Sequence, residues 1–357
     1  EVCDMPYPKL VIDTKKLAHN TRVLAERCAA RGVALAAVTK VYCAFPELAR
    51  VQAASGVAWL ADSRLENLAK IQDIPVPKIL LRLPMISQAE EVVALADLSF
   101  NSEIATCKAL AAAAQKQGKI HDVLLMVDLG DLREGVWPDR AVEAAGEILA
   151  LEGLRLRGVG VNLTCYGGVL PSVENMTRLV EVAEAIEARY GLSLDIISGG
   201  NSSSLKLLAS GKMPSRINHL RLGESVVLGF ETAEGTRIPG TEGDAFTLAA
   251  EIVELQTKPS VPVGEIGRDA FGQVPVFEDR GMRRRAIVAA GRQDLRIDAM
   301  SPRDDKIIIL GASSDHMILD VTDSSREWQV GDAVEFDLAY GALLAATTSP
   351  YVTKEFI

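Results

Sequence analysis

The first part of the 357-residue chain alternates short apolar segments with amphipathic segments of helical periodicity. The apolar segments lie at 33–39, 58–61, 79–83, 97–100, 123–128, 154–163, 194–198 and 218–223. The helical segments lie at 46–54, 63–71, 87–95, 102–118, 138–151, 172–190 and 202–210. Such alternation is typical of parallel βα units. Eight units in about 220 residues predict a (β/α)8 (TIM) barrel, and a doubly wound open sheet is the alternative fold.

The sequence pattern changes after Gly229. Residues 230–245 are punctuated by Gly, Pro and Thr, and strand-like segments without convincing helices follow. These segments lie at 246–255, 284–291, 305–311, 316–322 and 333–345. We therefore predict a barrel domain over residues 8–232 and a C-terminal β domain over 233–357, which the N-terminal residues 1–7 join.

Composition excludes several classes of protein. The net charge of −10 and pI near 5.1 argue against a nucleic-acid surface, although small anionic ligands stay possible. Uncharged runs reach about sixteen residues and contain Gly, Pro or Thr, so no membrane span is expected. The five cysteines form no CxxC pair and the four histidines have no metal-binding spacing, so neither a disulfide framework nor a metal site is expected. These features favour a reducing cytoplasm; because the chain starts at Glu1, we expect a preceding methionine or leader to be missing.

Polar residues at the carboxyl ends of barrel strands are the first candidates for chemistry, because active sites of this fold lie at that face. Lys40 follows the first apolar segment at such an end. The other candidates at these ends are Asp62, Arg82, Asp128, Arg133, Asn162, Cys165, Asn201, Ser202, Arg221, Gly223 and Glu224.

Two loops have the composition of a phosphate site. SGGNSSS (198–204) has two glycines that let the backbone approach a ligand, and Asn201 to Ser204 offer hydroxyls and amides at a helix start. Barrels commonly bind phosphate with the loops after their last two strands, and RLGES (221–225) is the second of these loops. A plain Asn/Ser helix cap is the alternative reading of 198–204.

A lysine at a strand end opposite a phosphate pocket indicates a Schiff base. Partial desolvation makes such an amine a nucleophile, and pyridoxal phosphate (PLP) has both a carbonyl group and a phosphate. There are three alternatives: Lys40 is an ordinary surface lysine, it is an aldolase-type lysine, or it belongs to a phosphosugar enzyme.

Taken together, these motifs resemble the alanine racemase family, the PLP enzymes of fold-type III, and within it the ornithine racemase-like branch. The resemblance covers essentially the whole chain. It rests on VTKVYC, LADSRLENL, MVDLGDLREG, NLTCYGG, ISGGNSSS, LRLGES, KPSVPVGEIG, GRQD, GASSDHMILDVT and YGALLAATTSPYV. It implies a PLP-bearing barrel, a C-terminal β domain and a homodimer whose active sites include residues of the partner.

The resemblance also implies roles for phosphate-binding residues. Lys40 would hold PLP as a Schiff base and act as one of two bases at Cα. Ser202 would bind the phosphate, with Gly223 and Glu224 contributing backbone amides. Tyr340 resembles the phosphate-binding tyrosine of the family, and Tyr42 lies near the spacing of another.

Two arginines receive roles in the same way. Arg133 would contact the phenolic oxygen of the cofactor and the carboxylate of the substrate. Arg221 would face the pyridine nitrogen. A guanidinium has donors but no acceptor, so it cannot stabilise a protonated ring nitrogen. The expected result is a weaker electron sink, which suits reversible proton exchange and discourages transamination or elimination.

Two departures from the family leave the second base open. Arg292 stands where the family has a catalytic tyrosine in the β domain, and Cys165 replaces a barrel histidine. Racemisation needs an acid–base group on each face of Cα. Cys165 is the first candidate, and Asp315 or His316 of the partner subunit are the others.

We therefore expect a PLP-dependent amino-acid racemase, with ornithine or another basic amino acid as substrate. Asp315 or Asp294 is expected to receive the distal ammonium. The alternatives are a fold-type III decarboxylase or aldolase and a PLP-binding homeostasis protein without turnover. Relatives of the last type usually lack a β domain, so residues 233–357 count against it.

Overall fold

The computed structural model describes residues 6–269 and 271–357. Residues 15–243 form one compact unit; residues 244–357 and the described N-terminal residues up to Thr14 form the other. Of the residues discussed above, 1–5, with Cys3, lie outside the described part of the chain.

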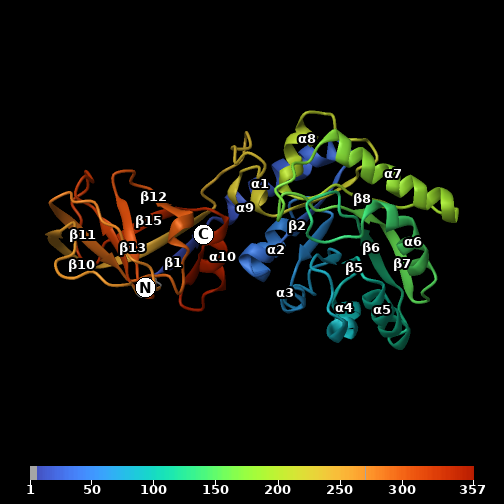
Figure 1. Cartoon of the computed structure of the whole chain (residues 1–357), viewed down its shortest axis with the longest axis horizontal. Coiled ribbons are helices and arrows are strands. Elements are labelled where there is room, and N and C mark those ends of the chain that lie inside the picture. Colours follow the sequence, from blue (N-terminus) through green and yellow to red (C-terminus); the bar gives the residue numbers. More distant parts are fainter. Residues whose placement is uncertain (1–5, 270) are drawn as a thin grey trace. The chain divides into compact units, whose positions relative to one another are not determined.

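The first unit is a (β/α)8 barrel, as the alternation predicts. Within the described residues its eight strands pair in parallel and close on themselves (Figure 1). They are β2 (Ala34–Val38), β3 (Trp59–Asp62), β4 (Lys78–Leu80), β5 (Leu98–Asn101), β6 (His121–Met126), β7 (Leu154–Gly160), β8 (Ile196–Ser198) and β9 (His219–Leu222). Because the strands are parallel, all their carboxyl ends meet at one end of the barrel.

Helices lie around the outside of these strands (Figure 1). They are α1 (Thr14–Ala29), α2 (Pro46–Ala53), α3 (Leu65–Lys70), α4 (Ala89–Leu95), α5 (Ile104–Lys116), α6 (Pro138–Leu149), α7 (Val173–Tyr190), α8 (Leu205–Ala209) and α9 (Glu224–Leu228). Helix α7 begins with a capping box between Ser172 and Asn175 and ends at Gly191, whose φ is 65°. These local signals explain why its bounds follow the periodicity closely.

The barrel interior is filled by side chains of alternate strand residues. They include Ala36, Val38, Ala61, Ile79, Leu98, Phe100, Leu124, Met126 and Ile196. The interior is therefore a packed core, and chemistry is confined to its carboxyl end. None of the helices in residues 6–269 and 271–357 is long and apolar enough to cross a membrane.

The second unit is built on a mostly antiparallel sheet with strand order β12-β15-β10-β11-β14-β13. Strand β1 joins it by pairing antiparallel with β10 and parallel with β16. The strands are β1 (Lys9–Ile12), β10 (Phe246–Pro259), β11 (Met282–Val288), β12 (Met300–Pro302), β13 (Ile308–Ala312), β14 (Met317–Asp320), β15 (Ala333–Leu338) and β16 (Thr353–Phe356).

The expected segment 333–345 is not one strand. It divides into β15 and helix α10 (Tyr340–Thr348). The alternation of β15 stops where the run of alanines and leucines begins, and these residues favour a helix. The expectation of a β domain without helices was therefore wrong at this position.

The unit boundaries also differ from the expected 232/233. The pairing of β1 places residues 9–12 with the β unit. Residues 233–243 stay with the barrel: Asn20 on α1 accepts a hydrogen bond from Glu242 N (2.7 Å) and donates one to Glu242 O (2.8 Å). His19, also on α1, bonds through Nε2 to Gly240 O at 2.8 Å.

Candidate active site

The barrel candidates lie where the sequence expects them, at the carboxyl ends of the strands. Lys40 opens the 3-10 turn η1 (Lys40–Tyr42) after β2, and Arg221 lies in β9. The others follow β6, β7, β8 and β9. Arg133 and Cys165 lie in loops, Ser202 and Glu224 begin a 3-10 turn and helix α9, and Asn201 and Gly223 are the residues just before them. One end of the barrel therefore gathers a lysine, two arginines, a thiol and a group of hydroxyls.

A buried hydrogen bond fixes the end of the strand that bears Lys40. Thr39, the preceding residue, donates from Oγ1 to Asp62 Oδ2 at 2.6 Å. Asp62 also accepts from Arg64 N and Asn67 Nδ2, and these bonds oppose the effect of burial, which raises the pKa of its carboxyl. The start of η1 is thus anchored to the neighbouring strand β3.

The carboxyl of Glu224 interacts electrostatically with the amine of Lys40. Burial raises the pKa of the Glu224 carboxyl, and the charge of Lys40 opposes that shift. Lys40 follows β2 and Glu224 begins α9 after β9, and these two strands are neighbours in the closed barrel.

The two expected phosphate loops meet through serine hydroxyls. Ser202 Oγ lies 2.9 Å from Ser225 Oγ and accepts a hydrogen bond from Ser225 N at 3.2 Å. Both side chains are buried. Ser225 was not among the sequence candidates, although its place in RLGES was a usable signal.

Asn201 ties the same loops to the loop after β7. Its Oδ1 accepts from Ser203 N at 2.9 Å, which caps the 3-10 turn η3 (Ser202–Ser204). Its Nδ2 donates to Leu163 O at 2.9 Å and to Cys165 Sγ at 3.4 Å. Asn201 is therefore both the cap that the alternative reading proposed and a contact of Cys165.

Arg221 is a buried cation with neutral hydrogen-bond partners. Its side chain donates to Ser198 Oγ (2.6 Å), Val161 O (2.9 Å) and Asn162 Oδ1 (3.4 Å), and its guanidinium lies 5.1 Å from the centre of the Phe100 ring. Burial lowers the pKa of Arg221 to about 10, so it stays charged at neutral pH.

A buried histidine contacts the serine to which this arginine donates. His219 Nδ1 lies 2.8 Å from Ser198 Oγ, and burial lowers the pKa of His219 to about 3, so the ring is neutral. Since Ser198 Oγ accepts from Arg221, its own proton is available for Nδ1, which assigns the ring proton to Nε2. Among the described residues His219 Nε2 has no hydrogen-bond partner, and neither has the buried Asn162 Nδ2.

Arg133 forms an ion pair with its neighbour. It donates through Nε to Glu134 Oε2 and through Nη2 to Glu134 Oε1, the latter at 2.6 Å. The bond to Glu134 raises the pKa of Arg133, to which the charges of Cys165 and Asp131 add. Glu134 was not among the sequence candidates.

Cys165 is exposed in the loop after β7. Cys165 acts electrostatically on both arginines: it raises the pKa of Arg133 and opposes the lowered pKa of Arg221. The thiol therefore shares one electrostatic neighbourhood with the two guanidiniums.

Backbone strain gathers at the same end of the barrel. Within the described residues, the non-glycine residues with left-handed φ are Cys43 (54°), Ala44 (49°), Leu132 (58°) and Thr164 (68°). They lie in the loops after β2, β6 and β7; Leu132 precedes Arg133, and Thr164 precedes Cys165. Such conformations cluster at functional sites, because the surrounding structure must hold them in place.

Tyr42 does not occupy a ligand-binding position. Its side chain is fully buried, and its hydroxyl donates to Gln52 Oε1 of α2 at 2.6 Å. Burial raises the pKa of Tyr42 well above its ordinary value. Tyr42 is part of the packing between η1 and α2.

The remaining candidates lie in the β unit. Asp315 and His316 are exposed in the turn between β13 and β14, and Tyr340 begins α10. The GRQD loop lies beside that turn: Arg292 N donates to Ser313 O at 2.9 Å and Gln293 N to Ser314 O at 3.0 Å. The fold thus brings together two segments that the sequence analysis considered separately.

Asp294 differs from the expectation that it could receive a substrate ammonium. It is buried and accepts a hydrogen bond from Ser349 Oγ at 2.6 Å. Its role is to connect the GRQD loop with the end of α10.

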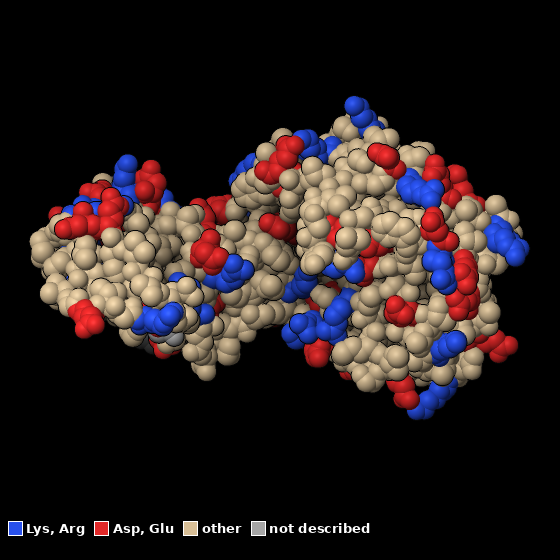
Figure 2. Space-filling model, viewed as in Figure 1, with Lys and Arg blue, Asp and Glu red and all other residues tan. Residues whose placement is uncertain are grey.

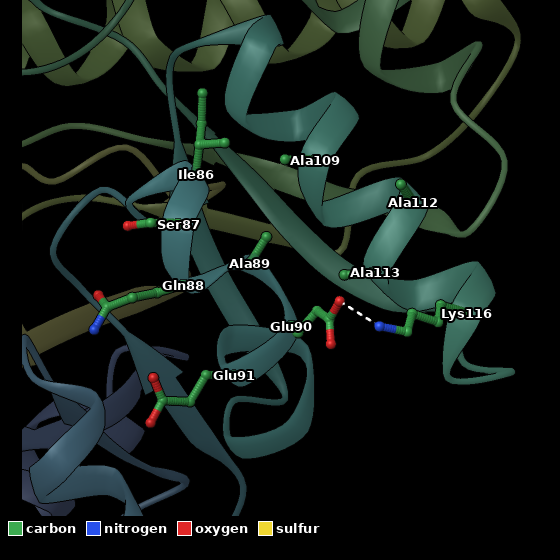
Figure 3. Close-up of a pocket in the computed structure, with 10 residues that line it drawn as sticks. All are labelled: Ile86, Ser87, Gln88, Ala89, Glu90, Glu91, Ala109, Ala112, Ala113 and Lys116. Atoms are coloured by element: carbon green, nitrogen blue, oxygen red, sulfur yellow. Dashed lines mark hydrogen bonds and ion pairs between the residues drawn. The ribbon is translucent and has the colours of Figure 1, made fainter.

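A groove of about 520 Å3 lies elsewhere on the barrel, between α5 and the segment formed by η2 (Ile86–Gln88) and α4 (Figure 3). Alanines of α5 form part of its wall, and Glu90 forms an ion pair with Lys116 at 2.6 Å. None of the candidate residues lines this groove. Figure 2 shows acidic and basic side chains intermixed over the face that it draws.

Comparison with known proteins agrees with this arrangement. Residues 12–229 match the model of the alanine racemase N-terminal domain. The chain is 48% identical over 352 residues to an ornithine racemase of Acetoanaerobium sticklandii (98% of this chain, 100% of that protein). It is 38% identical over 354 residues to a lysine racemase of Thermotoga maritima (99% of both).

A solved structure shares the fold. The alanine racemase of Bartonella henselae, which has covalently bound pyridoxal phosphate, superposes with a TM-score of 0.76 at 17% identity. The alignment covers 99% of this chain and 100% of that one.

Proposed function

Since this chain belongs to the alanine racemase family and is an amino-acid racemase, we propose that it interconverts the L and D enantiomers of ornithine with bound pyridoxal phosphate. The observation that carries the proposal is the identity with an ornithine racemase over the whole chain. The 38% identity with a lysine racemase supports a basic amino acid as the substrate class.

The chemistry of the barrel end fits an anionic carbonyl cofactor. Lys40 offers an amine, and the paired hydroxyls of Ser202 and Ser225 offer donors to a phosphate. The buried Asn162 Nδ2 is a donor that no described residue satisfies. Gly200, with φ of 107°, allows the backbone to turn closely here, where a side chain would be strained and would meet Ser204 Oγ.

The proposal assigns the holding of the cofactor to particular residues. Lys40 would bind it covalently. Asn201, Ser202, the backbone amides of Gly223 and Glu224, and Tyr340 would hold its phosphate. Arg221 would donate to the ring nitrogen, and Arg133 to the phenolic oxygen and the substrate carboxylate.

Pyridoxal phosphate, when bound, withdraws electrons from Cα of an amino acid and so acidifies its hydrogen. Arg221 moderates that effect, since a permanently charged donor opposes protonation of the ring nitrogen. Its buried setting and fixed partners keep the guanidinium in one orientation. This environment favours return of a proton to Cα over transamination or elimination.

Two groups must exchange the proton, one on each face of Cα. The proposal gives one face to the Lys40 amine and the other to the Cys165 thiolate. One group takes the proton and the other, in its protonated form, returns one, so the amino acid leaves with inverted configuration. The guanidiniums of Arg133 and Arg221 share an electrostatic interaction with this thiol. Asp315 and His316 of a partner subunit are the alternatives for the second face.

Arg133 already has a carboxylate partner, which limits how it can bind a substrate carboxylate. Glu134 engages its Nε and Nη2, so the substrate either displaces Glu134 or uses the remaining Nη1. For the distal ammonium, Asp315 is the better of the two expected carboxylates, because it is exposed and Asp294 is buried.

We further propose that the enzyme is a cytoplasmic homodimer with shared active sites. The free thiols of Cys28, Cys107 and Cys165 fit a reducing compartment. Mixing Lys40→Ala with Asp315→Ala subunits tests the shared site: activity that returns on mixing supports it, and two variants that stay inactive together contradict it.

The function itself is tested on purified protein loaded with pyridoxal phosphate. L-ornithine is added, and chiral chromatography follows the appearance of D-ornithine, with Lys40→Ala as the inactive control. Formation of D-ornithine up to an equal mixture supports the proposal. Release of carbon dioxide or of an aldehyde without D-ornithine would instead show a decarboxylase or an aldolase, and cofactor binding without turnover a homeostasis protein.

A further inference from the structure

Asp131 is a buried carboxylate that the proposed reaction does not use. It lies in the loop after β6, two residues before Arg133, and only 1% of its surface is accessible to solvent. Burial of a carboxylate is costly unless hydrogen bonds compensate for lost water, so its contacts indicate why it is there.

The contacts of Asp131 cross to the next loop of the barrel. Oδ1 accepts from Thr164 N at 2.9 Å and Val169 N at 3.1 Å, and Oδ2 accepts from Tyr166 N at 3.0 Å. A Cβ at Gly167 would lie 2.7 Å from the Asp131 carbonyl oxygen, so glycine permits the close approach. The loop that bears Cys165 is wrapped around this carboxylate.

A second carboxylate in the loop after β6 behaves differently. Asp128 Oδ1 accepts from Gly130 N at 2.9 Å and Leu132 N at 3.1 Å, both within its own loop. Asp128 therefore holds the conformation of the segment that carries Asp131. Asp131 in turn connects this segment to the loop after β7 by hydrogen bonds.

The anchor acts directly beside Cys165. Thr164 and Tyr166, the two flanking residues, both donate their backbone N–H to Asp131. Thr164 has a φ of 68°, which a threonine adopts only when its surroundings impose it. Without the carboxylate, the loop would relax this strain and move the thiol.

We propose that Asp131 is a positioning residue that sets the orientation of the Cys165 thiol toward Arg133 and Arg221. This inference rests on the proposed function, in which Cys165 is the second proton-transfer group. Asp131 touches neither substrate nor cofactor; it acts through the backbone on each side of Cys165.

The test uses Asp131→Asn, which keeps the shape but replaces an acceptor oxygen with a donor that faces backbone N–H groups. The matched control is Glu231→Gln. Glu231 is also buried and accepts backbone N–H groups of its own loop, from Ala233 (2.9 Å), Glu234 (3.1 Å) and Thr236 (3.0 Å), but no residue of the active site.

The first readout needs no cofactor. Alkylation of the Cys165 peptide by iodoacetamide at pH 7 is followed by mass spectrometry, with the Cys43 peptide as internal reference. We expect alkylation of Cys165 to slow about tenfold in Asp131→Asn, because the thiol moves away from Arg133 and Arg221, and nearby cations promote the reaction of a cysteine. Glu231→Gln should leave the rate unchanged.

The second readout is the ratio of Cα deuterium uptake from L- and D-ornithine in heavy water. A displaced Cys165 should slow exchange from one enantiomer about tenfold while exchange by Lys40 persists. A purely structural role would reduce both rates equally. Asp131→Glu, which keeps the charge but displaces the donors, should change both readouts in the same direction and serves if Asp131→Asn does not fold.

Unchanged alkylation of Cys165 in folded Asp131 variants would overturn the positioning role. Slowed alkylation with an unchanged enantiomer ratio would support that role and would instead contradict Cys165 as the second base. The two proposals therefore fail in different ways.

Discussion

Arg221 donates a hydrogen bond to Ser198 Oγ at 2.6 Å, and both side chains lie inside the barrel with little or no exposure to solvent. Ser198 in turn contacts His219 Nδ1 at 2.8 Å. The cation that the proposal places at the cofactor ring therefore donates to a serine that a neutral histidine contacts, and no carboxylate among the described residues is bonded to it.

Replacing Ser198 with alanine should change both stability and the spectrum of the bound cofactor. Loss of the hydroxyl leaves a buried donor of Arg221 unpaired, at a cost of about 1–3 kcal/mol in the free energy of unfolding. The freed guanidinium should also shift the visible absorption band. Denaturant unfolding and absorption spectra measure the two effects.

Ser99→Ala is the control for that experiment. Ser99 Oγ contacts His121 Nε2 at 2.8 Å in a similar buried pair, and no arginine within residues 6–269 and 271–357 is hydrogen-bonded to it. It should lower stability and leave the spectrum unchanged. A shifted band in Ser99→Ala, or none in Ser198→Ala, would argue against a specific role for Ser198.

The protein should become less stable as the pH is lowered, because two histidines are buried in the neutral form. Burial lowers the pKa of His219 to about 3 and that of His121 to about 4, from 6.5. Between the folded pKa values and 6.5, the unfolded chain therefore binds more protons than the folded chain. The contribution of the neutral histidines to stability is fully present above pH 6.5 and is lost as the pH falls from 6.5 toward the folded pKa values. Each histidine contributes a slope of about 1.4 kcal/mol per pH unit.

Urea unfolding at pH 7, 6 and 5 tests this dependence. His219→Gln should flatten the slope by about one proton, since glutamine does not titrate. An equal slope in both proteins would mean that His219 is not buried as a neutral ring.

A charge cluster at the amino end of the barrel should serve stability alone. Asp122 accepts from Arg155 (2.7 and 2.8 Å) and from Arg157 Nη1 (2.6 Å). Asp122→Asn should lower the free energy of unfolding by about 2 kcal/mol, a value reduced for the exposure of Arg155. Cofactor uptake and the enantiomer ratio should not change, as expected for the face opposite an active site.

Replacing Cys165 should separate the two faces of Cα. In Cys165→Ala, deuterium exchange should persist from the enantiomer whose proton faces Lys40 and fall by about 100-fold or more from the other. Cys165→Ser, which keeps a weaker acid of similar size, is the matched variant. Intact exchange from both enantiomers would transfer the second role to Asp315 or His316 of the partner subunit.

The barrel could be predicted because its signals are local. Apolar runs such as 33–38 and helical periodicity such as that of α7 each define an element, and strand ends then locate Lys40, Arg133 and Arg221. The strand β1 was harder to assign, because its partners β10 and β16 are more than 200 residues away in sequence.

The supporting residues could not be predicted, because their function exists only in the fold. Ser198, His219 and Asp131 are ordinary polar residues in the sequence. Their contacts join neighbouring strands and loops, as when Asp131 receives the backbone of residues 164–169. The spacing of residues within one segment does not indicate which residues of another segment they contact. The helix α10 was missed for another reason: its apolar alanines and leucines have no clear periodicity to separate them from a buried strand.

The most direct test of the account is deuterium uptake at Cα of ornithine by the loaded wild-type enzyme in heavy water. Starting from either enantiomer, we expect deuterium at Cα, loss of optical rotation and an equal mixture of L- and D-ornithine, all abolished in Lys40→Ala. Optical rotation that stays constant from both enantiomers, with no deuterium at Cα, would contradict the account.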